Sequence, residues 1–171
     1  MNNSNDLLIN VEDLRIAFRN SKEVNEVVHG VNFQIRSNEV LGIVGESGSG
    51  KSVTALALMG LLPKKSCAIT GKLTYGSTDL LKLTQKQWQK IRSNKIAMVF
   101  QEPMSALNPS MHCGKQVAEV LLQHADISKS EAKIEVLRLF EQVRLPDQEK
   151  IYKSYPHEIS GGQMQRVVIA M

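Results

Sequence analysis

The segment GESGSGKS, Gly45 to Ser52, is the most informative part of this sequence. It fits the pattern GxxxxGK[ST], in which glycines let backbone N–H groups converge on phosphate oxygens. An apolar run, VLGIV from Val40 to Val44, comes directly before it, and a helical pattern from Ser52 to Leu62 follows. A buried strand, a Gly-rich loop and a helix in this order are the context that the motif requires. The sequence therefore predicts a phosphate-binding loop.

Each position of the loop has an expected role in holding a nucleotide. We expect Lys51 to reach the β and γ phosphates and the hydroxyl of Ser52 to ligate Mg²⁺. Side chains at the glycines would block the backbone conformation or the approach of phosphate, and the helix that begins near Lys51 adds its partial positive charge. The alternative is a Gly-rich turn that binds nothing. The residues predicted to bind the nucleotide are Gly45, Glu46, Ser47, Gly48, Ser49, Gly50, Lys51 and Ser52.

Strands are expected on both sides of this loop. Apolar and other residues alternate around Leu14, Ile16 and Phe18, and again over residues 31–36, which indicates half-buried strands of an antiparallel sheet. The segment KIAMVF, residues 95–100, resembles the run before the loop, and both are typical of strands buried on both faces of a parallel sheet. The sequence therefore predicts an α/β fold.

Helices are expected later in the chain. Thr84 and Gln87 have the spacing of a capping box, and so do Ser128 and Glu131. From Met111 onward the spacing of apolar residues is helical. The first predicted helix carries Val117, Val120, Leu121 and His124 on one face, and the second carries Ile134, Leu137, Phe140 and Val143. Pro146 is expected to end the second helix.

Two further motifs define the class of protein. They are VFQEPMSALNP, residues 99–109, and ISGGQMQR, residues 159–166. Together with the phosphate loop they closely resemble the ATPase subunits of ATP-binding cassette (ABC) transporters, in which they are the Walker A motif, the Q-loop and the signature motif. GESGSGKS, QEPMSALNP and YPHEISGGQMQR are similar to the cassettes of dipeptide, oligopeptide and nickel importers.

The resemblance implies roles for residues outside the loop. Gln101 would contact Mg²⁺ or the attacking water, and Phe18 would stack on adenine, although a Phe at this alternating spacing is also expected in a core. The signature residues are expected to bind ATP held by the partner subunit, because exposed backbone N–H groups at the start of a helix form an anion site. For these residues the alternative is a helix cap without a ligand. They are Ser160, Gly161, Gly162 and Gln163.

The resemblance also implies an architecture for the whole chain. Residues 1–171 would be a single ABC ATPase domain of the P-loop NTPase type, with an antiparallel β subdomain, a partial RecA-like parallel core and a helical subdomain. Residues 1–104 would hold the β subdomain and the nucleotide-binding core, 105–158 the helical subdomain, and 159–171 the signature motif with the start of its helix.

The implied cofactors are ATP and Mg²⁺, and the implied partners follow from the same resemblance. They are a second ABC ATPase subunit, two integral-membrane permease subunits and, indirectly, an extracytoplasmic substrate-binding protein. The N-terminus lacks the pattern of a signal peptide, so we expect the chain in the cytoplasm, peripheral on the membrane. Lys and Arg are scattered and aromatic residues make up 5%, which argues against nucleic acid as a partner.

Members of this family continue beyond the signature helix into a Walker B Asp, a catalytic Glu and a switch His. None of these follows Met171, so we expect an incomplete fold with exposed apolar faces and little or no ATP hydrolysis by these residues alone. An interrupted or incompletely recorded gene, half of a split ATPase, and a short nucleotide-binding module remain open explanations.

Two other functions are alternatives to transport. Chromosome-maintenance ATPases with the same cassette would insert a long coiled coil between the Q-loop and the signature, but Gln101 and Ser160 are only 59 positions apart, without sustained heptads. The second alternative is a nucleotide-dependent binding module that never hydrolyses ATP. The sequence beyond residue 171 and the neighbouring genes would separate it from a transporter.

Overall fold

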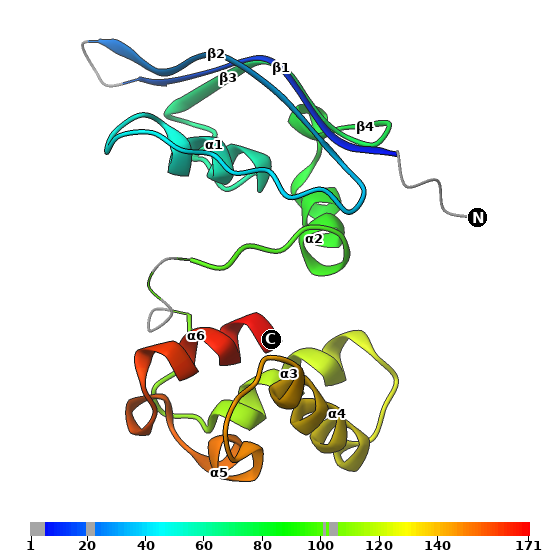
Figure 1. Ribbon diagram of the computed structural model, residues 1–171. Helices are drawn as coiled ribbons and strands as arrows, with labels where there is room; N and C mark the ends of the chain where they lie inside the picture. Colours follow the sequence, from blue (N-terminus) through cyan, green and yellow to red (C-terminus); the bar gives the residue numbers. More distant parts are fainter. Residues whose placement is uncertain (1–5, 20–22, 101, 103–105) are drawn as a thin grey trace. The chain divides into compact units, whose positions relative to one another are not determined.

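The structure is a computed structural model that describes residues 6–19, 23–100, 102 and 106–171. The chain divides into two compact units, Met1–Ala97 and Met98–Met171. The first unit contains all the strands among the described residues, and the second contains only helices and loops (Figure 1). The subdomain boundaries expected from the sequence stay predictions.

The first unit is built on a four-stranded antiparallel sheet in the order β2-β1-β3-β4. The long central strand pairs with β2 on one side, where Ile16 lies opposite Val28, and with β3 on the other, where Val11 lies opposite Leu73. This confirms the antiparallel sheet predicted from the alternating residues. The strands are β1 (Leu7–Arg19), β2 (Val24–Arg36), β3 (Cys67–Tyr75) and β4 (Thr78–Asp79).

Two helices and a 3-10 turn pack on one face of this sheet: α1 (Lys51–Leu58), η1 (Leu80–Lys82) and α2 (Gln85–Asn94). Both helices lie below the sheet in the view of Figure 1. Burial of each large apolar side chain stabilises the unit by about 1.5–3 kcal/mol. The core comprises Val11, Leu14, Ile16, Val28, Ala57, Leu73, Leu80, Leu83 and Trp88.

The helix ends follow local sequence signals. The capping box of Thr84 and Gln87 is present, as predicted, and begins α2. The helix after the phosphate loop ends at Leu58, earlier than the predicted Leu62, because Gly60 takes a left-handed φ of 60°. A Cβ at Gly60 would lie 2.3 Å from the Trp88 ring, so the close approach of α1 to α2 also requires glycine there.

The two predicted parallel strands are not formed. Residues 40–44 and 96–100 have no regular secondary structure, and Val40 and Val44 are 96% and 93% exposed. A strand needs a neighbour that satisfies its backbone N–H and C=O groups, and no described strand pairs with either segment. The prediction of these two strands is therefore wrong for the described residues, whereas the expected exposure of apolar side chains is confirmed.

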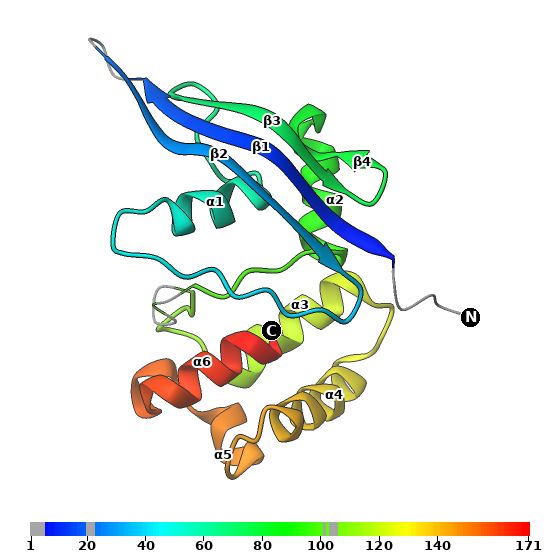
Figure 2. The same cartoon turned by 45° about the horizontal axis from the view of Figure 1, so that its top comes forward.

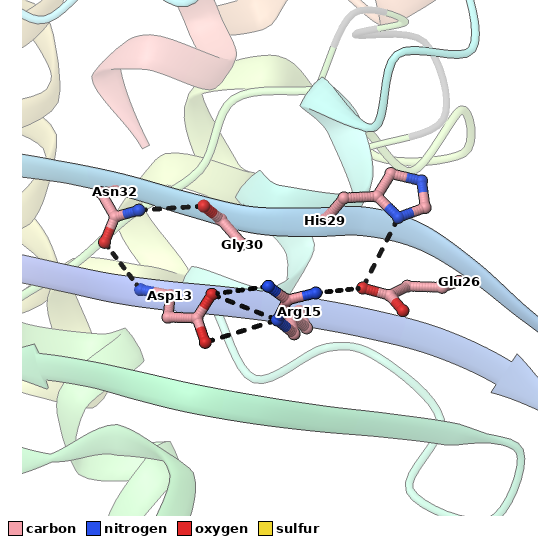
Figure 3. A network of polar contacts seen from close by, with 6 residues as sticks. All are labelled: Asp13, Arg15, Glu26, His29, Gly30 and Asn32. Carbon is pink, nitrogen blue, oxygen red and sulfur yellow. Dashed lines mark hydrogen bonds and ion pairs between the residues drawn. The ribbon is translucent and has the colours of Figure 1, made fainter.

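A bulge crosses the three long strands and carries a polar network on the sheet (Figure 3). Asp13 has φ 46°, its carboxylate lies 3.1 Å from the guanidinium of Arg15, and Arg15 also contacts Glu26 at 3.2 Å. Gly30 on the neighbouring strand has a left-handed φ of 76°, which favours glycine, and a Cβ there would lie 2.5 Å from the Asp13 carboxylate. The amide nitrogen of Asp13 donates to the side chain of Asn32.

The second unit is a small helical cluster, whose helices are seen from a second direction in Figure 2. Its core is made largely by the buried residues Cys113, Val117, Val136, Phe140 and Val167. The elements are α3 (Cys113–His124), α4 (Lys129–Gln142), α5 (Gln148–Lys153), η3 (Pro156–Glu158) and α6 (Gly161–Ala170).

Helix α4 differs in detail from its prediction. Its capping box of Ser128 and Glu131 is confirmed. Its buried face carries Ala132, Val136 and Phe140, whereas the predicted Ile134 is 68% exposed. The helix ends at Gln142, before Pro146, because Arg144 adopts a left-handed φ of 56° and its N–H donates to the Glu141 carbonyl. None of the helices in the described part of the chain is long and apolar enough to cross a membrane.

Candidate functional site

The predicted phosphate loop lies directly before α1. Gly48 and Gly50 have φ of 83° and 85°, in the left-handed region that favours glycine. Gly50 is the N-cap of α1, and a Cβ there would lie 2.9 Å from the Val27 carbonyl oxygen. At Gly45 an added Cβ would lie 2.7 Å from the Ser49 hydroxyl, so the Ser49 side chain would have to move. The loop is therefore tightly turned and approaches β2 closely.

Lys51 folds over this loop. Its ammonium nitrogen donates to the carbonyl oxygens of Gly45 at 2.8 Å and Glu46 at 2.6 Å, and lies 3.2 Å from the hydroxyl of Ser49. The positive charge is thus held beside the N-terminus of α1, where the first backbone N–H groups of the helix have no intrahelical acceptor. Both features attract an anion to the same place.

The residues of the loop fit a nucleotide with Mg²⁺. The cradle is free of side chains at its glycines, and Ser52 offers an exposed hydroxyl. Mg²⁺ commonly takes few protein ligands and completes its shell with phosphate oxygens and water. Among the described residues, no group of three or more His, Cys, Asp or Glu could hold a metal ion. An open pocket at the loop is lined by Val27, Gly48, Ser49, Gly50, Lys51, Ser52 and Val53.

The structure says less about the two other residues that are predicted to contact the nucleotide. Gln101 lies outside the described residues. Phe18 is half-buried on β1, opposite Asn25 and Cys67, and packs against the core of the sheet. The sequence offered a core position as the alternative for Phe18, and this packing agrees with that alternative. The contact of Phe18 with adenine stays a prediction.

The signature residues form the beginning of α6. Ser160 is the N-cap: its hydroxyl accepts from the Gln163 amide at 3.3 Å, and the Gln163 side chain accepts from the Ser160 amide at 2.9 Å. Gly161 and Gly162 are exposed, and a Cβ on either would meet nothing within 4 Å. Ser160 and Gln163 thus have a structural role in capping, and the bare helix start suits an anion. Binding of the partner's ATP stays a prediction.

A stack of rings precedes the signature helix. His112 and Tyr155 stack with ring centroids 4.2 Å apart, and Tyr155 and His157 with centroids 5.6 Å apart. The carboxylate of Glu158 accepts from the amide of Tyr155 at 2.8 Å, which holds the turn before Ser160. No sequence signal indicates this stack, because nothing local connects His112 to a residue more than forty positions later.

Sequence reasoning also missed Val27, whose contact with the loop arises from non-local packing of β2.

Burial has a chemical effect at Cys113, which is fully buried in the helical unit. Removal from water disfavours the thiolate and raises the pKa of this thiol to about 11.

A Gly-rich loop that is followed by a helix and covered by a lysine side chain is typical of P-loop nucleotide-binding proteins. The sequence profile of the ABC transporter family matches residues 28–171, and the chain belongs to this family.

Curated relatives agree with this assignment. The oligopeptide transport ATP-binding protein OppD of Escherichia coli strain K12 is 48% identical over 97% of this chain and 49% of its own length. The dipeptide transport ATP-binding protein DppD of Bacillus subtilis is 43% identical over 96% of this chain and 49% of its own length. The chain therefore spans about half the length of the curated relatives it matches.

Solved structures confirm the fold class. The ATP-binding cassette MJ0796, in a dimeric post-hydrolysis state bound to ADP and Pi, superposes with a TM-score of 0.81 at 26% identity, over 95% of this chain and 68% of that one. The cassette cbiO1 of Clostridium perfringens, part of the transporter complex cbiONQ, gives a TM-score of 0.76 at 25% identity, over 96% of this chain and 60% of that one.

Proposed function

We propose that this chain is the ATP-binding part of an ABC importer, for dipeptides, oligopeptides or nickel. The single observation that carries the nucleotide assignment is the position of the Lys51 ammonium, bound by the carbonyl groups of Gly45 and Glu46 at the start of α1. The names of the curated relatives support peptides as the cargo. The cargo itself would contact the permease and the substrate-binding protein.

The loop residues 45–52 are proposed to hold the phosphates of MgATP. Lys51 would exchange its carbonyl partners for β and γ phosphate oxygens, which bind an ammonium more strongly because the hydrogen bond then joins two charged groups. Ser52 and Gln101 would orient Mg²⁺, and Phe18 would support the adenine. Mg²⁺ supplies charge neutralisation at the transferring phosphate when it is bound.

The start of α6 is proposed to act on a second nucleotide. Ser160, Gly161, Gly162 and Gln163 would bind the γ phosphate of ATP held by a second ABC ATPase subunit. That role supports a dimer, attached on the cytoplasmic side of the membrane to two permease subunits. The MJ0796 cassette is itself dimeric in its post-hydrolysis state, which is consistent with this proposal.

Hydrolysis of ATP is a property of the family. We propose that residues 1–171 by themselves bind ATP and hydrolyse it slowly or not at all. The reason is that neither the Asp that completes the metal shell nor the Glu that polarises water is identified among them. Phosphoryl transfer depends mostly on such positioning and charge.

The transport assignment is tested by the DNA on both sides of the codons for residues 1–171. An in-frame Walker B segment together with adjacent permease genes supports an importer. A stop codon with unrelated neighbours would instead favour a nucleotide-dependent binding module that never hydrolyses ATP.

A further inference from the structure

Although Lys and Arg are scattered along the chain, one segment of the first unit has few acidic residues to balance them. Between Glu46 and Glu102 the sequence has nine Lys and Arg residues but a single acidic residue, Asp79. The whole chain has 21 basic and 17 acidic residues, so the remainder holds more acidic than basic side chains. A block of one sign within a nearly balanced chain predicts a surface for an anionic partner.

Five of these lysines define what we name the basic face: Lys64, Lys65, Lys82, Lys86 and Lys90. All five are exposed. Lys86 and Lys90 are one helical turn apart on α2 and therefore project from the same side. The Nζ atom of Lys64 lies 3.5 Å from the carbonyl oxygen of Leu83, which brings the segment before β3 next to the start of α2.

The opposite side of α2 anchors the basic face to the unit. Trp88 is 3% exposed and packs in the core of the sheet unit, and the guanidinium carbon of Arg92 lies 5.4 Å from the centroid of its ring. The capping box at Thr84 fixes the start of the helix. Lys82 contacts Asp79 at 3.0 Å, which partly balances its charge. The backbone of the basic face is therefore held by the core, while its lysine side chains are exposed to solvent.

We propose that the basic face binds the anionic phospholipid headgroups of a membrane surface. Lysines near an anionic bilayer each contribute to adsorption without a shaped pocket. A protein partner is disfavoured because lysine is depleted, and aromatic residues enriched, in protein interfaces. Single-stranded nucleic acid is disfavoured because bases stack on exposed aromatic rings, and the one aromatic residue of α2 is buried.

The test is sedimentation of the purified chain with phospholipid vesicles. The chain should sediment with vesicles that contain phosphatidylserine, should stay in solution with pure phosphatidylcholine, and should be released as salt is raised, because exposed charges are screened. Equal binding to both kinds of vesicle would overturn the proposal. So would an absence of lipid binding, including the case in which the chain binds polyglutamate or DNA instead.

Two matched double variants locate the site. K86Q/K90Q should bind phosphatidylserine vesicles about tenfold or more weakly, since each lysine near the surface contributes several-fold. K150Q/K153Q removes the same charge from the exposed lysines of α5 and should change binding by less than about twofold. Glutamine keeps helix propensity, and circular dichroism checks the fold. Equal losses in both variants would show only a response to net charge and would contradict the assigned face.

Discussion

The ammonium nitrogen of Lys51 lies 2.6 Å from the carbonyl oxygen of Glu46. This contact places a positive charge inside a loop whose backbone is turned by two left-handed glycines, Gly48 and Gly50. The loop thus combines a cation, bare N–H groups and free space, which together suit a polyphosphate better than any of them alone.

The two left-handed glycines of the loop should differ when they are replaced. G48A introduces a strained φ but meets open space, so it should destabilise the unit by about 1–2 kcal/mol. G50A has the same strain and also brings its Cβ within 3.0 Å of Val28, so it should cost about 1–3 kcal/mol more. Urea unfolding measures both. Equal losses would show that the approach to β2 does not constrain Gly50.

Arg144 and Arg166 provide a test of the helical unit. Arg144 has a left-handed φ at the end of α4, and its carbonyl oxygen accepts from Arg166 Nη1 at 2.6 Å. R144G keeps this carbonyl and relieves the backbone strain, so it should stabilise the unit by about 0.5–1 kcal/mol. R138G, within α4, should destabilise by about 1 kcal/mol. A lower melting temperature for R144G would contradict the account of the helix end.

The pKa of Cys113 predicts how stability changes at high pH. The pKa of this thiol is raised to about 11 in the folded chain from a reference value of 9.0. The unfolded chain therefore loses the proton first, and stability should fall between about pH 9 and 11, by about 2–3 kcal/mol in total. Below pH 9 this contribution is fully present. C113A should lose this part of the slope in urea unfolding; an unchanged slope would contradict the role of burial.

The proposed binding of a partner's ATP by the signature residues can be separated from their role in capping α6. S160D retains a good N-cap, so stability should change by less than about 1 kcal/mol. It also places a negative charge where a partner's phosphate would bind, and should abolish MgATP-dependent association measured by sedimentation. S128D makes the same change at the N-cap of α4 and should leave association intact. Normal association of S160D would refute the proposed contact with a second nucleotide.

The features that the sequence predicted well are local. The capping boxes at Thr84 and Ser128 depend on residues three positions apart, and the alternation in β1 reports directly which side chains face the core. The need for glycine in the loop was also predictable, because a left-handed φ favours glycine at that position whatever its distant neighbours are.

The features that it did not predict depend on distant partners. Residues 40–44 are apolar enough for a buried strand, but a strand forms only beside another strand. The contact of Gly50 with Val27, the stack of His112 on Tyr155 and the grouping of lysines around α2 likewise join segments far apart in the chain. Phe18 shows the same limit, because alternation cannot distinguish a core residue from one that binds adenine.

The binding of MgATP to a Lys51→Ala variant shows whether residues 45–52 hold the nucleotide. Calorimetric titration should show binding by the unchanged chain and by Lys65→Ala, which removes an equal charge outside the loop, and no measurable binding by Lys51→Ala with its circular dichroism preserved. Lys51→Ala that binds MgATP as tightly as the unchanged chain would contradict the assignment of residues 45–52 as the nucleotide site.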